Sequence, residues 1–181
     1  MYRTGHMGIN LILFSPILFI LIVLELYVLG IFGLGFVFYF ASIPDMDLNY
    51  WFLKHRGFTH TYSFALLFGL VPLALSFVLS KLLFSIGVME YSPLTHVGIL
   101  IGGYLLGVFT VIGHILGDII TPAGVQPLQK PKYVPDSRIF SDKKYTLSLV
   151  YAANQWANTG FLFLGCITTT TAIVLGGMVI T

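Results

Sequence analysis

Long stretches without Asp, Glu, Lys or Arg constrain this chain more than any other feature of its sequence. Five of them come close to, or exceed, the roughly 20 apolar residues that a helix needs to cross the hydrocarbon core of a bilayer. Only 9% of the 181 residues are charged and 57% are hydrophobic, whereas about 25% of an ordinary soluble domain is charged. So few charges cannot cover a particle of this size in water. The sequence therefore predicts an all-α integral membrane protein and excludes a soluble globular one.

The five stretches predict five transmembrane helices in a single domain that comprises residues 1–181. The expected spans are residues 7–24, 26–44, 58–80, 97–117 and 158–181. The polar, proline-rich residues 121–144 predict a loop or a partly ordered cap. The aromatic stretch 145–157 predicts an interfacial segment, because rings with one polar end favour the membrane surface.

Glu25 alone separates the first two spans, which together are too long for one crossing. They predict a helical hairpin that turns between Glu25 and Gly35, with Gly30 and Gly33 as further candidate turn residues. A cleaved signal peptide is the alternative for the first stretch, but that stretch is long and leads straight into the second. Pro72 predicts a kink in the third span, since proline removes a backbone donor.

The fourth span carries glycine pairs at four-residue spacing, which permit close approach to other helices and predict a central position in the bundle. With five crossings, only Lys81 falls on one side of the membrane. By the positive-inside rule the other side is cytoplasmic, so the N-terminus is expected inside and the C-terminus outside. The cations expected on the cytoplasmic side are Arg3, Lys54, Arg56, Lys130, Lys132, Arg138, Lys143 and Lys144.

Seven histidines and aspartates lie at the ends of the expected spans, and the topology brings all of them to one membrane face. Ionisable groups at such positions are costly and are usually paired, metal-bound or functional. Imidazole and carboxylate together are the ligand set of hydrolytic zinc, manganese or iron sites. The sequence therefore predicts a metal site, with enough ligands for two ions and a bridging aspartate. The candidate ligands are His6, Asp45, Asp47, His55, His60, His114 and Asp118.

The histidine spacings leave alternatives open. His114 and Asp118 are four residues apart, so they project from one side of a helix as two ligands of one ion would. A simple hydrogen-bonded pair at the end of the helix explains the same spacing equally well. His55 and His60 need a turn at Gly57 to face one ion, and two interfacial histidines are the alternative.

Asp45 and Asp47 follow a proline, and alternate residues of an extended segment point in opposite directions. One of them is therefore expected to bind metal while the other orients a histidine, and simple interface polarity is the alternative. His96 lies near the opposite face and predicts an interfacial side chain. Cys166 has no charged neighbour in sequence that would activate a thiolate, so we interpret it as a packing residue.

Three sequence blocks carry a family resemblance. The blocks are PDMD at 44–47, HRGFTHT at 55–61 and GHILGDIITPAGVQPLQ from Gly113 onward. They resemble the signature blocks of the YdjM-like membrane-bound metal-dependent hydrolases, and His6 matches a histidine at the start of the family's first helix. The family is similar in motif logic to zinc-dependent phospholipase C and the P1-type nucleases. The resemblance implies cleavage of a phosphate ester or phosphodiester.

The expected activity is metal-assisted hydrolysis of a membrane lipid or lipid-linked substrate at the cytoplasmic membrane face. The expected cofactor is zinc or manganese, with two ions bound. Asp47 is expected to act as bridging ligand or general base, and Arg56 to bind phosphate. Lys54, Lys130 and Lys132 are expected to attract an anionic headgroup. A net charge of +2 gives no indication of a nucleic-acid partner. The alternatives are a non-catalytic adaptor stapled by metal and, less favoured, a metal-ion transporter.

Overall fold

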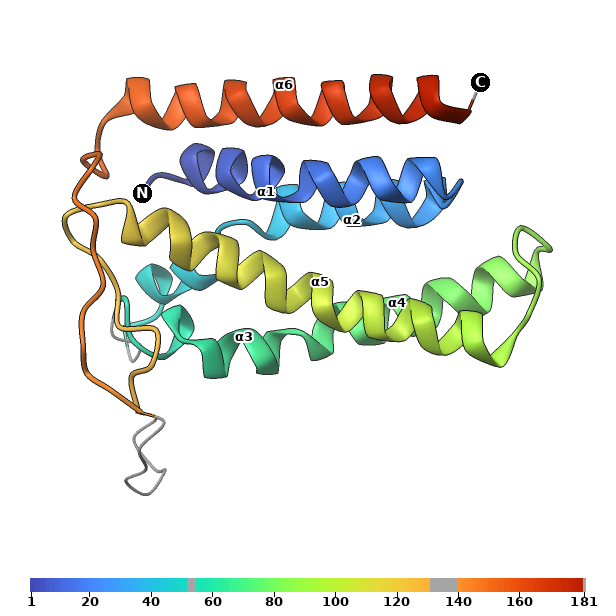
Figure 1. Ribbon diagram of the computed structural model, residues 1–181. Coiled ribbons are helices and arrows are strands. Elements are labelled where there is room, and N and C mark those ends of the chain that lie inside the picture. Colours follow the sequence, from blue (N-terminus) through green and yellow to red (C-terminus); the bar gives the residue numbers. More distant parts are fainter. Residues whose placement is uncertain (52–54, 131–139, 181) are drawn as a thin grey trace.

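The computed structural model describes residues 1–51, 55–130 and 140–180 and is a bundle of helices (Figure 1). Five helical segments are long and apolar enough to cross a membrane, which confirms the predicted all-α class and span count. Within the described residues, β-structure is limited to one isolated bridge. The elements are α1 (Arg3–Val23), α2 (Tyr27–Phe40), the 3-10 helices η1 (Ile43–Asn49) and η2 (Phe58–His60), α3 (Tyr62–Phe68), α4 (Leu70–Ser85), α5 (Pro93–Ile119) and α6 (Gln155–Ile180).

The expected hairpin is formed by α1 and α2, and it turns at Glu25, which has a φ of 57°. The expectation that glycines supply this turn was wrong, because all three candidates lie inside α2. Gly30 and Gly33 instead face Leu18 and Phe14 of α1, close enough that a side chain on either glycine would press on them. These glycines therefore serve close helix contact rather than chain reversal.

The third span consists of α3 and α4, which are separated at Gly69. Pro72 lacks the N–H that would bond the carbonyl four residues earlier, so the helix is interrupted just before the proline. A Cβ on Gly69 would lie 2.8 Å from the Tyr104 ring, so glycine also allows α5 to pack against the break. The predicted kink is confirmed. The span was expected to end at residue 80, but α4 continues through Lys81 to Ser85.

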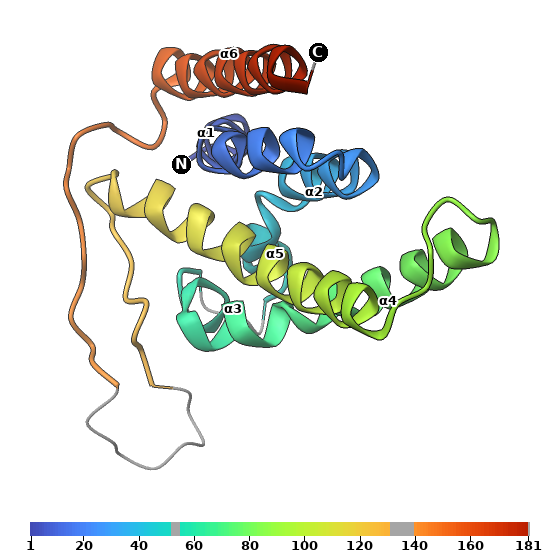
Figure 2. The ribbon, with the colours of Figure 1, turned by 45° about the vertical axis from the view of Figure 1, so that its right-hand side comes forward.

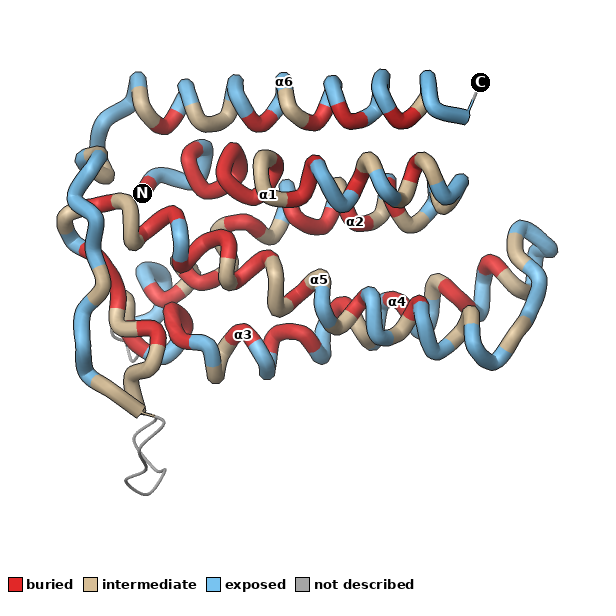
Figure 3. Tube along the Cα trace, in the orientation of Figure 1, coloured by how far each residue is buried: buried red, intermediate tan, exposed pale blue. Residues whose placement is uncertain are grey.

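The central helix is α5, which packs against α1, α2, α3 and α4, as the glycine pairs predicted (Figure 2). Gly103 and Gly107 approach α4, while Gly113 and Gly117 approach α1. In contrast, α6 lies along the outer side of α1. Buried positions follow the inner sides of α1, α2 and α5, and residues 5–11 of α1 are buried on every side (Figure 3).

The helices alternate in direction, so the start of α1, both 3-10 helices, the end of α5 and the start of α6 lie together. We call this the η1–η2 end of the bundle. The segment after α5 caps it, because Val125 pairs with Tyr145 and the Tyr62 N–H donates to the carbonyl of Pro127. Tyr151 and Trp156 are exposed on the expected interfacial stretch.

Candidate metal centre

Three imidazoles and two carboxylates converge at the η1–η2 end of the bundle. His6 comes from α1, Asp45 from η1, His60 from η2, and His114 and Asp118 from α5. The three histidines and Asp118 are fully buried, whereas the Asp45 side chain is 19% exposed. The topology thus brings together side chains that are up to 112 residues apart, between His6 and Asp118. We call these five residues the metal cluster.

The distances within the metal cluster match those between ligands that share an ion. His60 Nε2 lies 3.4 Å from Asp45 Oδ1 and 3.3 Å from Asp118 Oδ2. His114 Nε2 lies 3.5 Å and 3.7 Å from the same two oxygens. His6 Nε2 lies 3.8 Å from Asp45 Oδ2 and 3.6 Å from Asp118 Oδ1. Ligands about 2.1 Å from a tetrahedral ion are about 3.4 Å apart, whereas good hydrogen bonds are shorter than about 3.2 Å.

Several buried polar atoms of the cluster lack hydrogen bonds. Both ring nitrogens of His6 and Asp118 Oδ2 have no hydrogen-bond partner among the described residues. An unsatisfied buried polar group costs about 1–3 kcal/mol. The His6 and His114 rings also stack, with centroids 3.6 Å apart and planes 14° apart. A divalent metal ion at the cluster would satisfy His6 Nε2 and Asp118 Oδ2, so the residues present fit one.

Hydrogen bonds behind two of the histidines hold their Nε2 atoms toward the cluster. His114 Nδ1 lies 2.9 Å from the Ala41 carbonyl, to which it donates. His60 Nδ1 lies 3.3 Å from Asp47 Oδ2 and 3.0 Å from the Thr59 hydroxyl. Such partners fix the ring orientation of metal-binding histidines and are a regular feature of metal sites.

Burial lowers the pKa of His60, but its pairing with Asp118 and Asp45 outweighs burial and holds the pKa above its usual value. Without a metal, His60 therefore retains its proton more firmly than a free imidazole does. A metal must displace that proton, so metal uptake through His60 strengthens as the pH rises.

Asp47 does not belong to the metal cluster but lies behind it. Its Oδ1 faces His55 Nδ1 at 2.9 Å, and its Oδ2 accepts from the Arg56 backbone N–H at 3.0 Å and from the Thr59 hydroxyl at 2.9 Å. Because these donors and His60 Nδ1 occupy both oxygens, the geometry assigns Asp47 a positioning role in place of the expected bridging role. The expectation that one aspartate faces the site and the other orients a histidine agrees with this geometry.

Asp45 is the carboxylate that two potential ligand groups share. One group comprises His6, Asp45, His114 and Asp118, and the other comprises Asp45, His55 and His60. In each group the ligand atoms lie within 4.8 Å of one another. The second group faces outward, since the His55 side chain is 43% exposed.

Arg56 connects the metal cluster to the segment after α5. It adopts a φ of 59°, and its guanidinium donates to the Gly124 carbonyl at 2.9 Å and to Asp118 Oδ1 at 3.3 Å. The Met1 amino group donates to the same Asp118 oxygen at 2.9 Å. Arg56 thus lies beside the candidate ligands, as its place in the sequence predicted.

The structure describes only some of the other basic residues expected on this face. Lys54, Lys132 and Arg138 lie outside the described residues. Lys130 is partly buried in the segment after α5, and its role toward a headgroup stays a prediction. His96 lies at the opposite end of the bundle, where its Nδ1 is 3.0 Å from the Ser80 hydroxyl.

Sequence reasoning missed Thr59 and the Ala41 carbonyl as partners of the histidines. A hydroxyl residue directly before His60 is a signal that could have identified Thr59. No signal could have identified a backbone carbonyl, because every residue carries one.

A family model described as YdjM inner membrane protein matches residues 1–180. No curated protein and no solved structure matches the chain. The family match covers the five candidate spans and every residue of the metal cluster. The chain therefore belongs to the YdjM inner membrane protein family.

Proposed function

We propose that the protein is a membrane-bound metal-dependent hydrolase that cleaves a phosphate ester or phosphodiester of a lipid or lipid-linked substrate. The proposal rests on the convergence of three histidines and two carboxylates. The Nε2 atom of each histidine lies 3.3–3.8 Å from an oxygen of each carboxylate. Mixed nitrogen and oxygen ligands suit zinc or manganese. Two ions would share Asp45 as the bridging carboxylate.

The two ligand groups differ in a way that favours catalysis over a purely structural site. The inner group offers four side chains and is almost entirely buried, which suits a closed, structural ion. The outer group offers three side chains and includes the exposed His55, so it leaves a coordination position toward solvent. When bound, the metals would act as Lewis acids that lower the pKa of a water molecule and offset charge on the phosphate oxygens.

The protein's own residues prepare this outer group. Asp47 contacts both of its histidines, His55 and His60, and so fixes the direction of their free nitrogens. Arg56 adds a planar donor group beside Asp118, which suits binding of a substrate phosphate. A lipid substrate is favoured because these groups lie at the ends of membrane spans, at the depth of lipid headgroups.

Arg56→Lys is expected to raise KM for an anionic substrate about tenfold while changing kcat less, because an ammonium replaces a two-pronged donor by a point charge. Steady-state kinetics in detergent or nanodiscs measure both constants. Arg3→Lys, at an exposed arginine of the same end, is the matched control and should leave KM unchanged. Equal KM values for all three proteins would remove Arg56 from substrate binding.

The proposed orientation places the η1–η2 end in the cytoplasm, following the positive-inside rule. Glu90 lies in the loop between α4 and α5, at the opposite end from the exposed Lys144. In a background in which Cys166 is replaced by serine, Lys144→Cys should be protected from an impermeant thiol reagent added outside intact cells, and Glu90→Cys should react. If only Lys144→Cys were labelled, the orientation would be the reverse of the proposed one, with the metal cluster outside.

The proposed activity is tested by incubating the metal-loaded protein with total membrane lipids and comparing lipid species by mass spectrometry with the His60→Ala protein. The wild-type protein should deplete a phosphate-containing species, and a chelator should abolish the change until zinc or manganese is restored. An unchanged lipid profile, with the metal verified in place, would favour the metal-stapled adaptor.

A further inference from the structure

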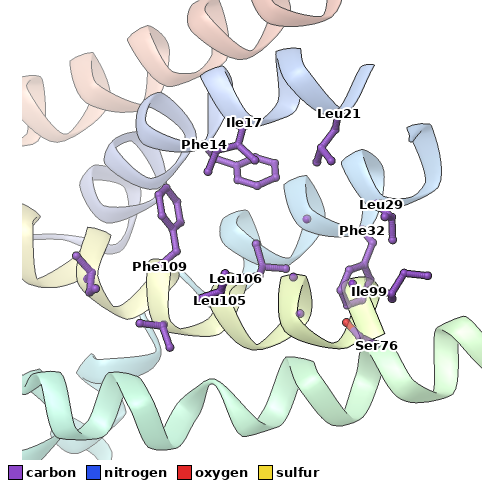
Figure 4. Close-up of a pocket in the computed structure, with 16 residues that line it drawn as sticks. Phe14, Ile17, Leu21, Leu29, Phe32, Ser76, Ile99, Leu105, Leu106 and Phe109 are labelled. Atoms are coloured by element: carbon purple, nitrogen blue, oxygen red, sulfur yellow. The ribbon is translucent and has the colours of Figure 1, made fainter. Parts of the chain in front are cut away.

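An apolar cavity of about 490 Å³ lies between α1, α2, α4 and α5 (Figure 4). Its volume falls within the range of about 300–1,000 Å³ that is typical of ligand pockets. Among the described residues that line it, Ser76 is the only one with a polar side chain. Aromatic and aliphatic side chains of three helices form most of the wall, among them Phe14, Leu21, Phe32, Leu105 and Phe109.

The cavity opens sideways, within the membrane-spanning part of the bundle. Ile17 and Leu105 line it and are 38% and 56% exposed, and both lie well inside candidate spans. A void there would forfeit dispersion contacts, and a water molecule inside would find too few polar partners. The surroundings therefore favour a hydrocarbon chain as the occupant.

One face of α1 leads from the metal cluster to this cavity. His6, Asn10, Phe14, Ile17 and Leu21 follow one another at intervals of four, four, three and four residues, so they share one face of the helix. His6 belongs to the metal cluster, and Phe14, Ile17 and Leu21 line the cavity. Phe14 lies about 12 Å along the helix axis from His6, compared with about 15 Å for half the hydrocarbon core.

We propose that the cavity holds one fatty-acyl chain of a membrane lipid whose phosphate lies at the metal cluster. That this lipid is the substrate rests on the function proposed above. A single acyl chain suits the cavity because a chain that extends through one leaflet, about 15 Å from the metal cluster, passes Phe14 at the near end of the cavity. The second chain of the lipid would stay in the surrounding bilayer.

Gly102→Phe tests the proposal because it adds a large side chain at a lining residue of the cavity where the backbone leaves room for a Cβ. A Cβ at Gly102 meets no atom within 4 Å, and the same is true of Gly177 on α6, which contributes nothing to the cavity. The probe is phosphatidic acid with a diazirine near the end of one acyl chain, cross-linked to the purified protein in nanodiscs. We expect labelled Phe109 and Leu105 in the wild type and in Gly177→Phe, and a several-fold loss of this label in Gly102→Phe.

Two results together would overturn the acyl-chain site. The label would be spread uniformly over the lipid-facing side chains, including the exposed Phe163 of α6, and the Gly102→Phe protein would show the same labelling as the wild type. The acyl-chain site would also be overturned if a polyprenyl phosphate, but not unlabelled phosphatidic acid, displaced the diazirine probe from the cavity. The labelling does not depend on turnover, so the two proposals fail separately. Cavity labelling by a wild-type protein that hydrolyses no lipid would refute the proposed function alone. Where hydrolysis is seen, Gly102→Phe should raise KM for long-chain phosphatidic acid and leave that for glycerol phosphate unchanged.

Discussion

Replacing His60 with alanine is expected to remove most of the bound metal and to lower the free energy of unfolding by about 3 kcal/mol. His60 is fully buried, and its Nε2 lies between Asp45 and Asp118. Its loss leaves a metal under-coordinated and removes the imidazole that lies nearest to both carboxylates. Elemental analysis measures the metal content, and thermal unfolding with and without a chelator measures the stability that depends on metal.

His96→Ala is the matched control for this experiment, because it removes a histidine at the opposite end of the bundle. His96 contacts Ser80 and the rings of Phe77 and Phe84, so its loss affects local packing. Metal content and the effect of the chelator should stay as in the wild type. Equal metal loss from His96→Ala and His60→Ala would show that the metal binds elsewhere.

Asp45→Asn and Asp47→Asn are expected to fail in different ways. Asp47 holds His55 and His60 from behind, so its amide variant should bind metal about 10–100-fold more weakly and regain most turnover at high metal concentration. Asp45 is shared by both ligand groups, so its amide variant should stay inactive even when metal is added in excess. Metal titration followed by a turnover measurement separates the two results.

This comparison also tests the role that the sequence predicted for Asp47. As a general base, Asp47 would be needed after the metal is bound, because an amide cannot accept a proton. Asp47→Asn would then stay inactive at full metal occupancy, as Asp45→Asn does. That result would contradict the positioning role inferred from the contacts of Asp47.

The spans were predictable because hydrophobicity over about 20 residues is a strong constraint in a bilayer. The convergence of the histidines and aspartates followed from the spans, because successive helices run in opposite directions. The start of one span and the end of the next therefore lie at the same membrane face. The prediction that glycines form the turn was wrong because glycine occurs in membrane proteins both at chain reversals and where helices pack closely. The sequence alone does not distinguish these two uses. Gly30 and Gly33 serve the second purpose.

The roles within the site depended on local geometry that the sequence does not specify. Asp45 and Asp47 were expected on an extended segment, but they lie on the 3-10 helix η1. With three residues per turn, side chains two positions apart point about 120° away from each other. Asp45 therefore faces the metal cluster, whereas Asp47 faces the back of His60.

The claim that this end of the bundle binds metal is tested most directly by anomalous X-ray scattering from crystals of the zinc-loaded protein. We predict one peak within bonding distance of His6, His114 and Asp118, and a second near His55 and His60, with Asp45 between the two. Anomalous peaks only at other side chains, or none after loading with zinc, would contradict the proposed metal centre.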